Sequence, residues 1–148
     1  MVKVVVDPAQ WLHGGKLSKV IRDLDRDKIS GEFPVSVLRS AHPALRGQQC
    51  CLGFALRQIA GVKVSALVEC DTPEAVKLTA AQVKKLVEVG LLREDAGGYG
   101  YLNTEAVYQL TDANDDYRVL TLRERKAKIR ALGRQIGIDF QFARKARP

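Results

Sequence analysis

The two ends of the chain carry hydrophobic positions in patterns that are typical of β-strands. Residues 2–6 read VKVVV, a nearly continuous β-branched run, and residues 138–142 read IDFQF, in which apolar and polar positions alternate. Alternation with a period of two indicates a strand that is buried on one face. Pairing of the two strands would bury the apolar side of both chain ends. We therefore expect both strands in one small sheet, mixed or antiparallel.

Apolar residues at helical spacing mark four further segments, which are residues 16–27, 50–60, 80–89 and 122–136. Gly61 follows the second segment and Gly137 follows the fourth, and glycine readily adopts the left-handed conformation that closes a helix. The third segment is preceded by Thr79 and has Gln82 three positions further on, which is the pattern of a capping box. The hydrophobic pattern therefore predicts four helices.

Shorter elements are predicted between these segments. Residues 91–101 read LLREDAGGYGY, and the paired glycines favour a β-hairpin because a tight turn requires positive φ. Residues 33–38 alternate loosely and predict a short edge strand, since Pro34 cannot donate to a ladder.

The dipeptide Asp7-Pro8 is a helix-start signal and predicts a short helical turn that holds Trp11 and Leu12. No internal repeat or low-complexity linker divides the chain. The pattern as a whole predicts an α+β fold with one domain over residues 1–142, followed by a basic tail over residues 143–148.

Composition restricts the class of protein. Hydrophobic residues make up 46% of the 148 residues and charged residues 28%, which is ordinary globular usage. Because no apolar stretch approaches the ~20 residues that cross a bilayer, we expect no membrane association. The three cysteines are an odd number and two of them are adjacent, which does not fit a secreted disulfide framework. We therefore expect a reducing compartment, the cytoplasm.

The positive charge is concentrated at one end. Residues 121–148 hold nine basic and two acidic residues, while residues 1–120 are balanced, so the end accounts for the whole net charge of +7. An acidic DNA mimic is excluded, whereas attraction to a polyanion stays open. The candidate nucleic-acid contacts form a stripe on the last helix, with Arg125 and Lys128 flanking it: Arg123, Lys126, Arg130 and Arg134.

Two observations weigh against nucleic acid. No aromatic residue interleaves the charges of this helix, although aromatic stacking is common in single-strand binding. The stripe could equally be the solvated face of an amphipathic helix.

A second candidate for nucleic-acid binding is the region of residues 79–110, whose order of helix and hairpin is similar to a winged helix. However, Lys84 and Lys85 are the only basic residues on its helix, and Glu88 opposes them.

The string CCLGF at residues 50–54 enters a predicted helix. A thiol at a helix N-terminus has a lowered pKa, which makes Cys50 and Cys51 candidate nucleophiles. A base is required, and the available histidines are His13 and His42, both upstream of the cysteines, with His42 as the named candidate. The alternative, which we favour, is that the thiols are small buried hydrophobes and that Gly53 lets another backbone pack closely.

A metal site is a further alternative that we do not favour. Adjacent cysteines cannot readily both bind one tetrahedral ion, and the CxxC spacing of zinc sites is absent. The acidic run over residues 112–116 lacks the spacing of a calcium loop. Because Asn and Asp dominate turns, this run predicts a turn that orients the last helix. We expect neither a metal nor another cofactor.

Several short motifs are similar to those of small uncharacterised proteins of bacteriophages and prophages. They include the CCLGF string at residues 50–54 and an Asn-Asp-Asp turn at residues 114–116. The motif residues to which no role is assigned are Trp11, Cys50, Cys51, Gly53, Asn114, Asp115 and Asp116. The long segment 27–49 and the hairpin depart from that layout. The resemblance implies phage origin and a reducing cytoplasm, but no activity.

The sequence therefore favours a non-enzymatic phage or prophage accessory protein that binds a macromolecular partner, with host interaction or counter-defence as a suitable role. A protein partner fits this hypothesis. Nucleic-acid binding through residues 121–148 is the first alternative, and a cysteine-dependent enzyme is the second.

Overall fold

The structure is a computed structural model, which describes residues 1–14, 38–40, 45, 47–98, 100–115 and 120–144. The helix expected over residues 16–27 lies outside the described residues, as does the strand expected over 33–38 except for its last residue.

The two chain ends pair as strands. Strand β1 (Val2–Val6) lies parallel to β4 (Ile138–Phe142), with Val2 opposite Ile138 and Val6 opposite Phe142. The α+β fold class and the pairing of the terminal strands are thus confirmed. The sheet is not mixed, however, because the antiparallel hairpin of β2 (Leu92–Glu94) and β3 (Tyr101–Asn103) forms a separate two-stranded sheet.

Three of the expected helices are present with nearly the expected bounds, as α2 (Cys51–Ala60), α4 (Ala80–Glu88) and α6 (Leu122–Gln135). Gly61 closes α2 in the left-handed conformation at φ 64°, as the C-cap rule predicts. Thr79 and Gln82 form the expected capping box at the start of α4. Local capping chemistry therefore sets these helix ends.

The helix α5 (Glu105–Asp115) was not expected, and the prediction of a turn over residues 112–116 is wrong for its described part. Val107, Leu110, Ala113 and Asn114 are buried along one side of α5. Burial of this stripe outweighs the weak preference of Asn and Asp for turns. The structure also contains two shorter elements, the helix α3 (Val64–Leu67) and the 3-10 turn η3 (Pro73–Ala75).

The helical turn expected around Trp11 is also absent. The Asp7 carboxylate instead accepts a hydrogen bond of 2.9 Å from the backbone N–H of Ala9, which forms a local turn. Trp11 then pairs with Gln49 in an isolated parallel bridge. Extended pairing with a distant segment satisfies the backbone that a helical turn would have satisfied locally.

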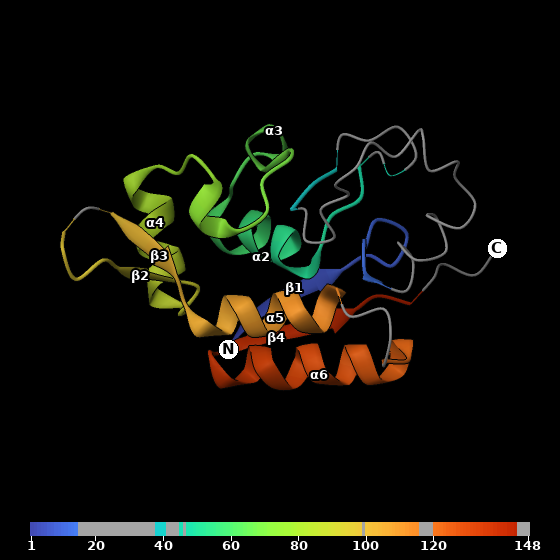
Figure 1. The fold of residues 1–148 in the computed structure, drawn as a ribbon. Coiled ribbons are helices and arrows are strands. Elements are labelled where there is room, and N and C mark those ends of the chain that lie inside the picture. The colour runs from blue at the N-terminus through green and yellow to red at the C-terminus, as the bar shows by residue number, and fades with distance from the viewer. Residues whose placement is uncertain (15–37, 41–44, 46, 99, 116–119, 145–148) are drawn as a thin grey trace.

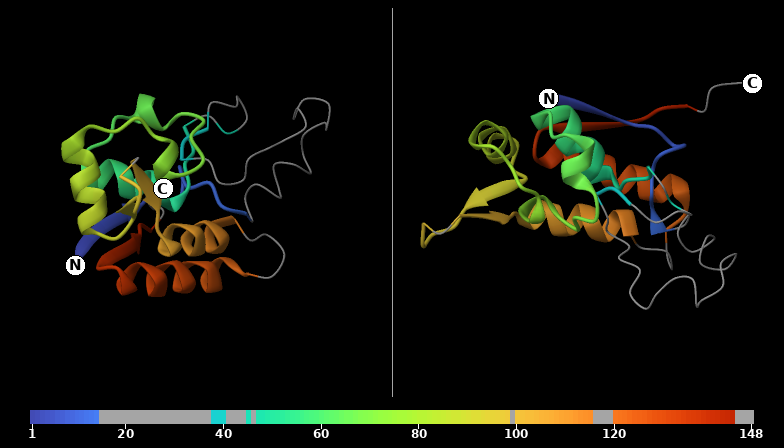
Figure 2. Two further views of the ribbon diagram at one scale, coloured as in Figure 1. Left: turned by 60° about the vertical axis from the view of Figure 1, so that its left-hand side comes forward. Right: turned by 90° about the horizontal axis from the view of Figure 1, so that it is seen from above.

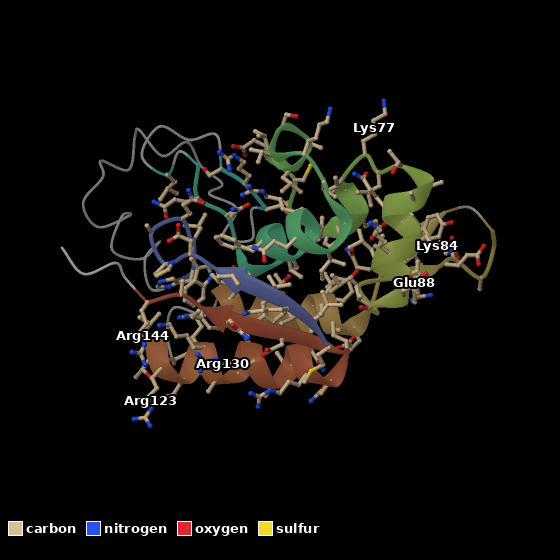
Figure 3. The ribbon with its side chains drawn as sticks, turned by 180° about the vertical axis from the view of Figure 1, so that it is seen from behind. Lys77, Lys84, Glu88, Arg123, Arg130 and Arg144 are labelled. Atoms are coloured by element: carbon tan, nitrogen blue, oxygen red, sulfur yellow. The ribbon has the colours of Figure 1, made fainter. Side chains whose placement is uncertain are left out.

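Within the described ranges, the helices lie on one side of the β1–β4 pair and none of them covers its other face (Figures 2 and 3). Helices α5 and α6 lie side by side, and α2 lies above β1 in the view of Figure 1. The β2–β3 hairpin projects beyond α4 at the left of that view (Figure 1). A single apolar cluster extends from Val4 of β1 through α2 to Phe140 of β4. No helix among the described residues is both long and apolar enough to traverse a bilayer.

Candidate functional site

Two exposed cations of the C-terminal region, Arg123 and Arg144, lie at one end of the β1–β4 sheet, whereas Arg134 lies in the last turn of α6, near the opposite end of that helix. Gly137, at φ 77°, reverses the chain between α6 and β4, so the first turns of α6 lie beside the end of β4. Figure 3 shows Arg123 and Arg144 together at this end, with Arg130 further along the helix. Arg123, Arg134 and Arg144 are exposed, whereas Lys126 and Arg130 are half-buried.

Phe142 lies beneath the two half-buried cations. The guanidinium carbon of Arg130 is 5.3 Å from the centroid of the Phe142 ring, and the ammonium nitrogen of Lys126 is 5.7 Å from it. Both distances are within the range of a cation–π interaction, which is worth about 0.5–1 kcal/mol where the cation is solvated. The ring therefore restricts two long side chains that would otherwise sample many rotamers.

The aromatic contact continues beneath Phe142. The Trp11 ring lies 4.8 Å from the ring of Phe142 and 4.4 Å from that of His13, between centroids. Trp11 is buried, while His13 and Phe142 are half-buried. An aromatic cluster of His13, Trp11 and Phe142 thus supports Lys126 and Arg130 from below.

This cluster was missed because its aromatic residues lie outside the helix that carries the charges. Helix α6 itself contains no aromatic residue, as expected. An aromatic ring from β4 nevertheless lies against its cations in the folded protein. The sequence did contain a signal for this cluster. The apolar residues 138, 140 and 142 share one face of the strand, and a strand that runs back along α6 brings its last apolar residue beside the first turns of the helix.

Arg125 does not belong to the basic surface, which consists of Arg123, Lys126, Arg130 and Arg144. Its side chain is only 1% exposed, and it donates hydrogen bonds to the backbone carbonyls of Ala113 at 2.8 Å and Asn114 at 3.0 Å. These carbonyls belong to the last turn of α5, where a cation offsets the negative end of the helix dipole. Arg125 shares the buried side of α6 with Ile129, four positions on, so it joins α6 to α5.

Asn114 is the centre of a buried polar cluster. Its side-chain oxygen accepts hydrogen bonds from the Trp11 indole nitrogen at 2.8 Å and from the backbone N–H of Cys51 at 3.2 Å. Its side-chain nitrogen donates to the Leu12 carbonyl at 2.9 Å and to the Asp115 carboxylate at 3.1 Å. One amide therefore joins α5, the N-terminus of α2 and the segment after β1. Asp116 lies outside the described residues.

Cys50 and Cys51 are buried at the N-terminus of α2. The pKa of the Cys50 thiol is raised to about 12, first by burial and then by the charge of Asp115, and these two effects outweigh nearby backbone N–H groups that lower it. The pKa of Cys51 is also raised, chiefly by burial. The expected lowering of the thiol pKa by the helix dipole is therefore wrong, because desolvation dominates. The candidate base His42 lies outside the described residues.

Gly53 has the packing role expected of it. A methyl group in place of its hydrogen would lie within van der Waals overlap of the Leu38 carbonyl oxygen. The backbone of residues 38–40 thus passes against α2, and Gly53 makes the approach possible. Trp11, Cys51 and Asn114 therefore meet in a buried junction rather than at a surface, and Gly53 packs against Leu38 and Gln49.

The other candidates are scattered. Cys70 is half-buried, and its thiol is 3.5 Å from the Ala66 carbonyl oxygen. Within the described ranges no group of three or more His, Cys, Asp or Glu residues could hold a metal ion. On α4, Lys84 and Lys85 are exposed, and Lys84 lies on the same side as Glu88 (Figure 3). The helix-then-hairpin order of α4, β2 and β3 is present, but the exposed charges of α4 are mixed.

Comparison with protein-family models, with curated proteins and with solved structures finds no match. The similarity to phage proteins stays a prediction.

Proposed function

We propose that this protein is a binding protein whose macromolecular partner is a nucleic acid, held through its phosphates by the basic end of the β1–β4 sheet. The observation that carries the proposal is the position of Phe142 beneath Lys126 and Arg130. Cations whose side chains are already ordered lose less conformational entropy when they bind a phosphate.

Charge distribution supports the same surface. The net charge of +7 derives entirely from residues 121–148, and Arg123, Arg130 and Arg144 all face solvent at least in part. Positive charge that is concentrated on one face attracts polyanions without regard to sequence. The exposed face of α4, where Lys84 is followed by Glu88, offers no such excess.

A cysteine-dependent enzyme is a weaker alternative. A nucleophilic cysteine needs an accessible thiolate, but Cys50 and Cys51 are buried and the pKa of each is raised. Scaffolding at the start of α2 accounts for both thiols. An accessory role in nucleic-acid transactions would also suit the proposed phage origin.

The test is fluorescence anisotropy with a labelled 20-nucleotide DNA strand, the corresponding RNA and the DNA duplex, each over a range of salt. About four cation–phosphate contacts predict that log K for a single strand falls with log[salt] with a slope of about −3. The double variant Lys126→Ala, Arg130→Ala should reduce the slope to about half. Phe142→Leu, which keeps all charges, should weaken binding about threefold because the cations lose their support.

The matched control is Lys84→Ala, Lys85→Ala on α4, which removes the same charge from another helix and should leave affinity within about twofold. No binding at low salt, or equal losses in the two double variants, would refute the proposed interface.

A further inference from the structure

The outer edge of β1 carries a contact that resembles the pairing of a neighbouring strand. In the parallel ladder with β4, Val2 donates to the Gly137 carbonyl and Val6 accepts from the Ala143 N–H. Backbone groups alternate in direction along a strand. Those of Lys3 and Val5 therefore point away from β4, toward the edge that faces α2.

The side-chain amide of Gln58, on α2, occupies this edge at Val5. Its oxygen accepts from the Val5 N–H at 2.7 Å, and its nitrogen donates to the Val5 carbonyl at 2.8 Å. A carboxamide presents one donor and one acceptor side by side, as the backbone of a paired strand does. Gln58 thus shields part of an edge that could otherwise pair with another chain.

A cleft of about 590 Å³ opens beside this contact, between β1 with its following turn and the C-terminal half of α2. Val5, which is 39% exposed, and Gln58 line it. Its charged residues are Arg57, Lys63 and Asp7. The cleft therefore combines a strand edge, an apolar surface and an excess of positive charge.

We propose that this cleft is a docking site for an extended peptide segment with acidic side chains, which pairs with the outer edge of β1 and displaces the Gln58 amide. The donor and acceptor of Val5 match a peptide backbone, whereas the phosphates of a nucleic acid present acceptors only. Arg57 and Lys63 select acidic side chains over basic ones. Addition of a strand to an exposed edge is a recurrent mode of peptide recognition.

The test uses fluorescence polarisation with a labelled heptapeptide of alternating Glu and Val. We expect saturable binding, and about tenfold weaker binding when Lys replaces Glu in the peptide. A peptide that is N-methylated at alternate residues should not bind. Gln58→Ala should strengthen binding several-fold, because no intramolecular competitor has to be displaced. Val5→Pro removes the outward N–H without touching the ladder with β4, and should abolish binding.

The basic surface of α6 could also attract an acidic peptide, so the variant Lys126→Ala, Arg130→Ala is the control and should bind the peptide normally. Arg57→Glu, Lys63→Glu should lose the acidic peptide while keeping nucleic-acid affinity, which separates failure of this site from failure of the proposed function. Circular dichroism checks that each variant folds. Weaker binding by Gln58→Ala, or equal binding of the Lys peptide, overturns the proposal. So does dimerisation of Gln58→Ala without peptide binding, which would assign the edge to a second copy of the chain.

Discussion

The indole nitrogen of Trp11 donates a hydrogen bond of 2.8 Å to the side-chain oxygen of Asn114, although the two residues are 103 positions apart. Both side chains are almost wholly buried. The contact joins the segment after β1 to the last turn of α5. Trp11 also contacts Phe142, the ring that lies beneath Lys126 and Arg130. Trp11 therefore connects the buried polar cluster to the basic surface.

Replacement of Asn114 by Ala should lower the free energy of unfolding by about 2–4 kcal/mol. The change leaves the Trp11 indole N–H and the Leu12 carbonyl without their partner in a buried environment. Urea denaturation, followed by the fluorescence of the single tryptophan, measures the loss. Gln109→Ala, at an exposed position of the same helix, is the control and should change stability by less than about 0.5 kcal/mol. Equal stability of the two variants would contradict a structural role for Asn114.

Replacement of Arg125 should affect stability and replacement of Arg123 should affect binding, although the two residues lie only two positions apart on α6. Arg125→Ala removes a buried cation from the carbonyl end of α5 and should lower the free energy of unfolding by about 2–4 kcal/mol. Arg123→Ala, at an exposed position, should leave stability within about 0.5 kcal/mol but weaken nucleic-acid binding. Denaturation and anisotropy on both variants separate the two roles. A stable Arg125→Ala protein with impaired binding would return Arg125 to the surface stripe.

Local signals predict the parts of this fold that local chemistry determines. The capping box at Thr79, the left-handed Gly61 and the glycine-tipped hairpin each depend on residues within a few positions of one another. The terminal strands could be paired because both are apolar and need cover. Their parallel orientation could not be derived, since it depends on the path of the whole intervening chain.

The buried junction could not be assembled from local signals. The run at residues 112–115 has the composition of a turn, and it is helical because one side of α5 is buried and because Asn114 and its neighbours contact Trp11, Cys51 and Arg125. The burial of Arg125 and the position of Phe142 beneath the cations likewise arise from tertiary packing. The stripe of basic residues was therefore predicted from helical spacing, whereas its aromatic support was not.

The buried thiols should make stability depend on alkaline pH. The folded protein holds the Cys50 pKa at about 12, above the ordinary value of 9.0, so the unfolded chain loses its thiol proton first as the pH rises. The stabilising effect is complete below pH ~9 and is lost between pH ~9 and ~12, with a slope of up to about 1.4 kcal/mol per pH unit for each thiol. Cys50→Ala should show a shallower decline in stability than the wild type between pH ~8 and ~10.5. In the native state at pH 8, an aromatic disulfide reagent should modify Cys70, which is half-buried, and should react with Cys50 and Cys51 only after denaturation. Parallel pH profiles for the two proteins, or rapid native labelling of more than one thiol, would place a cysteine of α2 in contact with solvent.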